Sequence, residues 1–369
     1  MDWFRAFDLV WVASLPTSFT PAACWIRYLP RNMGSSAWPG HPPAGGGATR
    51  TRARSPHGGR ESKLRPMRRT PVFGDPKTDF VFQRIFGSED HKTALLGFLN
   101  DILQLDEAHR VASVMLLPPE QRPKVSDLKY SIVDVKCVDA RGTTYVVEMQ
   151  VFNVEAFEKR VVYNVAKAYT NQLGVGVGFP ELDEVIGISI CDFELWSRRE
   201  GLDVPMLSRW RMREQRTGVR GLSELQFVFL ELPKYAGGHE PQSFVDKWAY
   251  FFREAGNLMA IPEALRHPSL LDALEGARTA RFNREEWDAY IAAGMAIQNE
   301  RGALSLAHRE GRTEEAARSV LTVLRARGIA VPDAVRERIL AEKDPARLER
   351  WLEKATAAAS VAEVVDDPI

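Results

Sequence analysis

Apolar residues begin to recur at regular intervals at about position 78, and their spacing predicts two helices. Phe82, Ile85 and Phe86 lie on one face of a first helix, which Thr78 or Asp79 would cap at its start. A second helix is expected to begin near Ser88. Its broad apolar face is formed by Leu95, Leu96, Phe98, Leu99, Ile102 and Leu103.

Short segments of alternating or continuous apolar residues follow, and they predict strands. These segments are Val111–Leu117, Ser131–Val138, Thr143–Phe152, Val185–Phe193, Met206–Met212 and Leu225–Leu232. A long helix is expected over Phe157–Leu173, between the third and fourth strands. Helices, three strands, a helix and then further strands form an order that is typical of an α+β fold with a central sheet.

The chain beyond Pro241 is predicted to be helical to its end. The expected helices are Ser243–Phe252, Arg284–Arg309, Thr313–Arg327, Pro332–Ala341 and Pro345–Ala359. A linker around Gly311 would separate the second of these from the third. We therefore expect a first domain over residues 67–240, a helical extension over 241–310 and a small helical module over 313–366.

Composition places the chain among globular proteins of more than one domain. Its 369 residues exceed the usual ~100–200 residues of one domain, and 45% of them are hydrophobic. Basic and acidic side chains number 49 each, so the overall charge favours neither a nucleic-acid-binding nor an acidic protein. Three cysteines without C-x-x-C spacing predict neither a disulfide framework nor a usual zinc site. No apolar run approaches the roughly 18 residues of a membrane span, and we expect a cytoplasmic protein without a membrane partner.

Residues 1–66 differ in composition from the rest of the chain. They are rich in proline, glycine, serine and arginine, and they show no periodic apolar pattern. Eleven lysine and arginine residues lie within residues 1–70, so the remainder is net acidic. We expect a disordered basic extension, or upstream sequence outside the native product with Met67 as the true start. The functional alternative is a basic arm that loosely holds nucleic-acid phosphates.

Two acidic residues interrupt the apolar strand pair that flanks Arg141. With the turn centred on Arg141, an antiparallel register places Asp134 opposite Glu148 and Lys136 opposite Val146. Facing carboxylates within apolar strands should repel each other, and burial increases that cost unless a cation neutralises them. A divalent cation with oxygen ligands would do so, in the arrangement that phosphodiester hydrolysis requires.

A purely structural interpretation of these residues stays open at this point. The hairpin could carry both acids on a solvated face, with Lys136 as their ion-pair partner. A register slip of one residue would also separate the two carboxylates. Spacing alone does not decide between a metal site and a solvated face.

Several segments, taken in order, resemble the PD-(D/E)XK nuclease family transposases, also called recombination-promoting nucleases. The resemblance covers roughly residues 71–235. It is carried by Lys77–Gly87, Leu99–Leu103, Asp134–Cys137, Tyr145–Gln150, Phe157–Tyr163 and Gly187–Leu195, with Lys167, Tyr169, Gln172 and Leu173. It implies that 67–240 is a nuclease-like domain with a restriction-endonuclease-like fold. Such a fold has a mixed central sheet flanked by helices, and a C-terminal all-helical region would follow it here.

The same resemblance assigns candidate roles to residues of the strand pair. Asp134 and Glu148 match the acidic pair that holds Mg²⁺ or Mn²⁺. Gln150 falls where many members of the wider superfamily have the motif lysine, and this family is similar in using Glu-x-Gln. Because Gln150 can orient a water molecule but supplies no positive charge, Lys136 is the nearest candidate cation. Asp79 matches a further motif position and is an additional candidate acid.

The helix after the strand pair carries candidate phosphate ligands. Arg160, Tyr163 and Lys167 share one of its faces and could contact DNA phosphates. The structural alternative for this face is a solvated, charged surface.

Residues 313–366 resemble the small helical module often appended to such nucleases. We expect this module to mediate interactions, including homo-oligomerisation, without adding chemistry.

Three functions follow from these patterns. The leading hypothesis is a Mg²⁺-dependent DNA endonuclease, a hydrolase linked to recombination or mobile elements. The first alternative is an inactive nuclease fold that binds DNA or protein. The second is a nuclease that uses the same site on RNA, or acts as a toxin or defence factor. Nothing in the sequence places a third acid for three-acid transposase chemistry.

Overall fold

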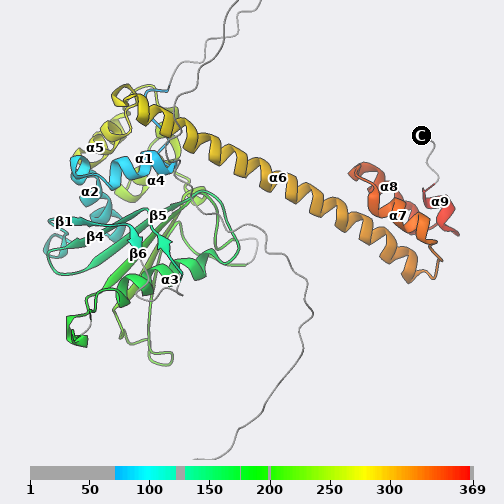
Figure 1. Cartoon of the computed structure of the whole chain (residues 1–369), viewed down its shortest axis with the longest axis horizontal. Helices are drawn as coiled ribbons and strands as arrows, with labels where there is room; N and C mark the ends of the chain where they lie inside the picture. Colours follow the sequence, from blue (N-terminus) through cyan, green and yellow to red (C-terminus); the bar gives the residue numbers. More distant parts are fainter. Residues whose placement is uncertain (1–70, 122–128, 175, 198–200, 366–369) are drawn as a thin grey trace, which may run out of the picture. The chain divides into compact units, whose positions relative to one another are not determined.

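The computed structural model describes residues 71–121, 129–174, 176–197 and 201–365 (Figure 1). The expected disordered extension over residues 1–66 lies outside these ranges. None of the described helices combines the length and the hydrophobicity needed to cross a bilayer.

A mixed sheet of six strands forms the centre of the fold (Figure 1). Its spatial order is β1-β4-β5-β6-β8-β7. The strands are β1 (Val114–Leu117), β4 (Val135–Asp139), β5 (Thr144–Gln150), β6 (Val185–Cys191), β7 (Leu207–Arg211) and β8 (Leu225–Glu231). Strand β4 is antiparallel to both of its neighbours, β1 and β5. Strands β5, β6 and β8 run parallel to one another, and the edge strand β7 is antiparallel to β8. The short strands β2 (Glu120–Gln121) and β3 (Ser131–Ile132) form a separate pair.

Helix α3 (Phe157–Thr170) connects the parallel strands β5 and β6 and packs on one face of the sheet. A parallel pair needs such a crossover, because its strands enter the sheet from the same end. The helix buries Val165 and Ala168 against Val146 of β5 and Val185 of β6. This face of β5 is also the face that carries the side chain of Glu148.

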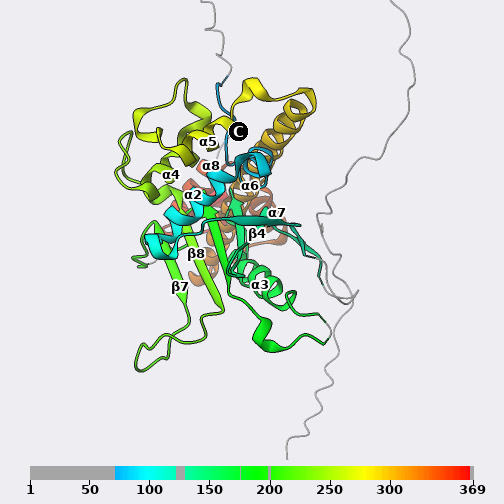
Figure 2. The same ribbon diagram turned by 90° about the vertical axis from the view of Figure 1, so that its left-hand side faces the viewer.

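The opposite face of the sheet packs on a larger helical layer. Its helices are α1 (Asp79–Phe86), α2 (Lys92–Leu103), α4 (Phe244–Glu254) and α5 (Pro268–Gly276). Phe82, Phe86, Phe98, Trp248 and Phe252 form an aromatic core there, in contact with the inward residues of β4 and β5. Figure 2 shows α2 and α4 lying over this face of the strands. Thr78 caps α1 as expected, whereas α5 was not predicted from the sequence.

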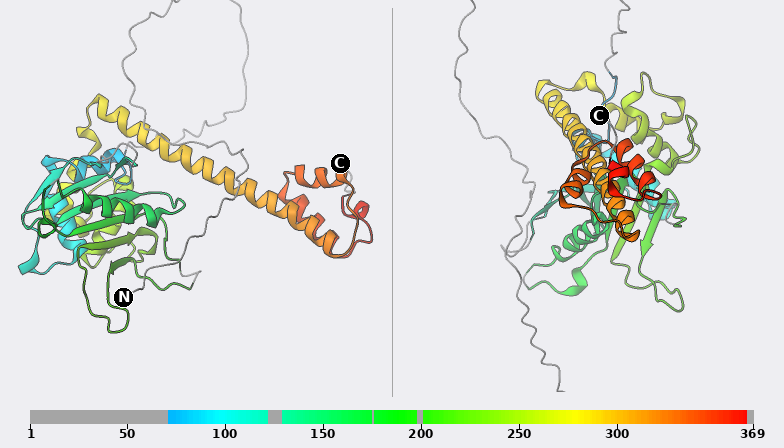
Figure 3. Two further views of the ribbon diagram at one scale, coloured as in Figure 1. Left: turned by 60° about the horizontal axis from the view of Figure 1, so that its bottom comes forward. Right: turned by 90° about the vertical axis from the view of Figure 1, so that its right-hand side faces the viewer.

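Most of the described chain beyond Asn283 is helical, and one expectation for this part was wrong. Helix α6 (Arg284–Ala326) runs without a break through Gly311, where we expected a linker. A single glycine costs a helix only about 1 kcal/mol relative to alanine, and the alanine, glutamate and arginine residues around it are good helix formers. The C-terminal half of α6 packs with α7 (Asp333–Ala341), α8 (Pro345–Ala355) and α9 (Val361–Val365) around a separate core that includes Leu324 and Trp351 (Figure 3).

Short 3₁₀ turns connect many of these elements. They lie at Glu89–His91, Glu107–His109, Phe179–Glu181, Leu232–Lys234, Ala255–Asn257, Glu263–Leu265 and Thr279–Arg281. Ser88 caps the first of them, so the second predicted helix begins as a 3₁₀ turn and continues as α2.

Candidate active site

The β4–β5 hairpin has the register expected from its sequence. Lys136 pairs with Val146 and Val135 pairs with Val147, and the paired register ends one residue before Asp134 and Glu148. The turn at positions 140–143 is held by Asp139, whose Oδ1 accepts from the backbone N–H groups of residues 141 and 143.

Asp134 lies where regular pairing of the hairpin stops, and here the structure differs from the predicted continuous strand. The strand expected over Ser131–Val138 is divided into β3 and β4, with Asp134 in a bend between them. Its Oδ2 accepts a hydrogen bond from the backbone N–H of Met149 at 2.8 Å. The Asp134 side chain thus takes the backbone N–H that a carbonyl of the neighbouring strand would otherwise accept from, and the hydrogen-bond ladder between β4 and β5 ends there. The carboxylate of Asp134 consequently reaches the peptide group that joins Glu148 to Met149.

Glu148 is a buried carboxylate with 8% of its surface exposed. Burial raises its pKa, while the nearby Arg160 guanidinium and a hydrogen bond from Asn164 act in the opposite direction. Asn164 Nδ2 donates to Glu148 Oε1 at 2.7 Å. Desolvation outweighs both favourable contacts, so the ionised form of Glu148 is destabilised by burial. A bound cation would offset this destabilisation.

Gln150 and Arg160 form the polar contact nearest to Glu148 along β5. The guanidinium of Arg160 donates to Gln150 Oε1, and Gln150 Nε2 donates to the carbonyl of Phe152 at 2.9 Å. Arg160 also lies over the ring of Phe157, with its Cζ atom 5.2 Å from the ring centroid. Position 150, where many members of the wider superfamily have the motif lysine, therefore holds a glutamine whose amide oxygen accepts a hydrogen bond from the Arg160 guanidinium.

Lys136 projects from the same face of β4 as the α3-facing residues of β5. It is partly buried, and that burial lowers its pKa. Within the described part of the chain, neither a hydrogen bond nor an ion pair to its ammonium group is found. Lys136 thus remains a candidate cation, and the ion-pair partner that the solvated-face interpretation required is not seen for it.

The predicted phosphate ligands on α3 are in different environments. Lys167 is buried and its ammonium group donates to the carbonyl of Lys129, with Ser131 Oγ at 3.5 Å. Tyr163 Oη donates to the same carbonyl at 3.1 Å. Both side chains hold the segment that leads into β3, so of the three predicted ligands Arg160 alone contacts a residue of the acidic motif.

Asp79 is exposed in the first turn of α1, on the helical layer opposite α3. The segment just before it is anchored close to the acidic motif. Lys77 Nζ forms an ion pair with Asp192 Oδ2 at 3.1 Å, and the N–H of Asp192 donates to the carbonyl of Gln150 at 2.9 Å. Asp79 stays a candidate acid.

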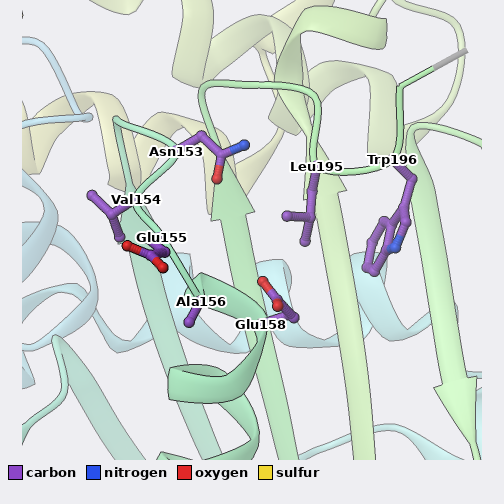
Figure 4. Close-up of a pocket in the computed structure, with 7 residues that line it drawn as sticks. All are labelled: Asn153, Val154, Glu155, Ala156, Glu158, Leu195 and Trp196. Atoms are coloured by element: carbon purple, nitrogen blue, oxygen red, sulfur yellow. The ribbon is translucent and has the colours of Figure 1, made fainter. Parts of the chain in front are cut away.

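A surface depression opens beyond the carboxyl end of β5. It is lined by Asn153, Val154, Glu155, Ala156, Glu158, Leu195 and Trp196. Figure 4 shows Leu195 and Trp196 on one side of it and the residues that lead from β5 into α3 on the other. None of these seven residues is basic and two are acidic, so this depression is poorly suited to bind a phosphate.

The donor set fits a divalent cation that prefers oxygen. Asp134 and Glu148 offer carboxylates, and Gln150 offers an amide oxygen. No group of three or more histidine, cysteine, aspartate or glutamate side chains that could hold a metal occurs within the described ranges. Two protein carboxylates suit Mg²⁺, which usually keeps several waters and accepts one or two carboxylates.

Sequence reasoning missed two buried amides beside Glu148. Asn164 and Gln121 are 3% and 1% exposed, and Gln121 Nε2 donates to the carbonyl of Asn164 at 3.3 Å. Asn164 Oδ1 and Gln121 Oε1 are buried without a hydrogen-bond partner among the described residues. The only sequence signal for Asn164 was its position four residues after Arg160, on the same face of α3.

Comparison with known protein families gives a match. The family model described as "PD-(D/E)XK nuclease family transposase" matches residues 76–304, which is more than half of the chain. No curated protein and no solved structure matches the sequence. The matched range contains the six-stranded sheet, both helical layers and the Asp134–Glu148 hairpin. The chain therefore belongs to the family of PD-(D/E)XK nuclease family transposases.

Proposed function

We propose that the protein is a Mg²⁺- or Mn²⁺-dependent DNA endonuclease, in which Asp134 and Glu148 hold the metal. The observation that carries this proposal is the contact of the Asp134 carboxylate with the Met149 N–H, which brings it to the peptide group that follows the buried Glu148 near the carboxyl end of β5. Membership of a nuclease and transposase family supports phosphodiester hydrolysis as the reaction.

Each residue of the site has a distinct task in this reaction. Asp134 is oriented by the Met149 N–H and Glu148 by Asn164, so both carboxylates are fixed before substrate binds. When bound there, a divalent cation supplies Lewis acidity and lowers the pKa of a coordinated water. Gln150 orients the attacking water through its amide group.

Two cations compensate for the absence of a lysine at position 150. Arg160 contacts Gln150 and lies near enough to Glu148 to oppose the rise in the pKa of that carboxyl group, so it is placed to stabilise negative charge on the scissile phosphate. Lys136 lies on the adjacent strand, and its lowered pKa makes it a candidate proton donor to the leaving oxygen.

Plasmid nicking tests the proposal. Supercoiled DNA is incubated with Mg²⁺ and with the wild type, Glu148→Gln or Glu181→Gln. Glu181 is an exposed carboxylate in a 3₁₀ turn outside the hairpin, so it is the matched control. We expect nicking by the wild type and the control, and a loss of about 100-fold or more for Glu148→Gln, because a metal carboxylate is removed.

The alternatives correspond to other outcomes of the same assay. Equal traces of cleavage by all three proteins, with retained DNA binding in a gel-shift assay, would indicate a nuclease fold that acts as a binding module. Cleavage of single-stranded RNA but not DNA, lost in Glu148→Gln, would indicate a ribonuclease that uses this site.

A further inference from the structure

Four arginines gather around the outer strand β7, and none of them forms an ion pair with an acidic residue in the described part of the chain. Arg209, Arg211 and Arg213 alternate along one face of β7 and its continuation, and a backbone bridge places Arg220 opposite Arg213. Like charges at directly opposite positions destabilise a strand pair. The concentration of positively charged side chains at this strand pair therefore lowers the stability of the fold.

Glu184 is near enough to Arg211 for the guanidinium to oppose the rise in the pKa of Glu184, but no carboxylate of the described residues lies within ion-pair distance of the four arginines. Among the described residues, none of the four arginines forms a salt bridge to aspartate or glutamate. Arg209 donates a hydrogen bond of 2.8 Å to the carbonyl of Ile102, at the end of α2. Burial lowers the pKa of Arg209, and the nearby charge of Arg211 lowers it further. Arg141 is different, since its guanidinium pairs with Asp139 at 2.8 Å.

The arginines line a cavity of about 830 Å³ between the end of α2, the β4–β5 turn and the β7–β8 hairpin. Its wall contains Arg141, Arg209, Arg211, Arg213 and Arg220, together with Asp106 and Glu184. Because Arg141 is paired with Asp139, the other four arginines against the two carboxylates leave a net charge of +2 on the lining. The volume is typical of cavities that bind small molecules.

This cavity is separate from the candidate active site. It is lined by Tyr145, Ile186 and Gln226, near the amino ends of β5, β6 and β8, and the first two pack in the core on the α2 side. Glu148 and Gln150 pair with residues near the carboxyl end of β6, and Glu148 faces α3. Figure 2 shows the β7–β8 hairpin extending past the end of the sheet opposite to the α4 side.

We propose that this cavity is a binding site for a small polyphosphate, either inorganic or attached to a nucleoside. The negative charges on adjacent phosphates complement the positive charge of the lining. Arginine suits such a ligand, because its planar fork binds phosphate oxygens through two hydrogen bonds at once. The concave shape favours a compact anion over a DNA duplex.

Calorimetric titration of the full chain tests the site. The probes are inorganic triphosphate, ATP and adenosine, in EDTA so that no metal links phosphate to the Asp134–Glu148 site. The test variant carries both Arg211→Ala and Arg220→Ala. The control is Arg216→Ala, because Arg216 lies in the same hairpin but does not line the cavity. We expect triphosphate and ATP to bind and adenosine not to bind. The double variant should weaken binding about 10-fold or more, and the control should not change it.

Three outcomes would overturn the proposal. Absence of binding by both phosphate probes excludes a polyphosphate site. Equal weakening in the double variant and in Arg216→Ala shows general charge attraction and not a built site. Binding of adenosine as tightly as ATP shows that the cavity recognises the nucleoside and not the phosphates. Equal binding of triphosphate and ATP identifies phosphate as the whole recognition element, whereas tighter ATP binding adds the nucleoside. None of these readings depends on DNA cleavage.

Discussion

At the scale of single residues, charge next to like charge is the informative signal in this chain. Asp134 beside Glu148 could be found from the sequence, because the turn at Arg141 sets the register of a simple hairpin. The arginines around β7 could not be grouped in the same way. Arg141 and Arg220 reach their cavity only after the β5–β6–β8 crossovers have formed, and no local spacing encodes that approach.

The buried carboxylate of Glu148 should make the metal-free protein less stable as pH rises. Its folded pKa lies above the ordinary value of 4.5, so the folded state retains a proton that the unfolded state releases. Stability is therefore lost as pH rises from the unfolded pKa through the folded pKa. We expect Glu148→Gln to unfold at a higher temperature than the wild type at pH 7 in EDTA, and the difference to vanish near pH 4. Thermal denaturation followed by circular dichroism measures both.

Added Mg²⁺ provides the control for that experiment. It should raise the unfolding temperature of the wild type at pH 7 and leave Glu148→Gln unchanged, because binding to the folded state alone stabilises it. A wild type that is more stable than Glu148→Gln at pH 7 in EDTA would contradict the assigned environment of Glu148.

Arg160 should act on the reaction more than on the fold, since it is exposed apart from its contacts with Gln150 and Phe157. Arg160→Ala is expected to lower the maximal cleavage rate by about 10²–10³-fold, the usual cost of one preorganised donor to a developing charge. Arg160→Lys should recover part of it. The matched control is Lys159→Ala, which removes an exposed cation one residue away. If Arg160→Ala cleaved DNA as fast as Lys159→Ala, Arg160 would have no part in the site. Single-turnover cleavage with saturating Mg²⁺ gives the rates.

At the scale of elements, the sequence was sufficient where periodicity alone sets the structure. The strand pair, the α3 crossover and the Thr78 cap followed from period, turn residues and capping. The interruption before β4 did not, because it depends on one side chain taking the Met149 N–H. The roles of Lys167 and Tyr163 were equally out of reach, since both depend on where the carbonyl of Lys129 lies after folding.

The continuity of α6 through Gly311 gives a prediction for that element. Gly311→Ala should leave the helix intact and stabilise it by about 1 kcal/mol, while Gly311→Pro should break it at a cost of about 3 kcal/mol. Limited trypsin digestion at the exposed Arg309 and Arg312 measures this, because a helix resists cleavage that a broken segment permits. Rapid cleavage of both the wild type and Gly311→Ala would mean that the linker expected from the sequence is the better description.

At the scale of the whole molecule, the described chain contains two large aromatic-anchored cores. Trp248 is fully buried in the layer that covers the sheet, and Trp351 is 1% exposed in the C-terminal helical core. No residue belongs to both. Each core should therefore respond separately to the loss of its own anchor.

Trp351→Ala should destabilise the C-terminal helices alone by about 3–5 kcal/mol, the usual cost of removing a large buried aromatic side chain. Hydrogen exchange followed by mass spectrometry should show faster exchange in α7 and α8 and unchanged exchange in β5 and β6. Trp248→Ala is the reciprocal control, with the opposite distribution expected. Faster exchange throughout the chain in both variants would show that the two cores unfold as one cooperative unit.

The position of β7 at the margin of the sheet gives its arginines a second effect. A terminal strand exposes unpaired peptide groups to which another chain can add, and proteins commonly prevent this with charged side chains. Two copies that approached through β7 would bring their guanidinium groups into mutual repulsion. Neutralising this row, by substitution or by an anion in excess, should therefore remove a barrier to the growth of insoluble assemblies, even where folding and chemistry are unimpaired.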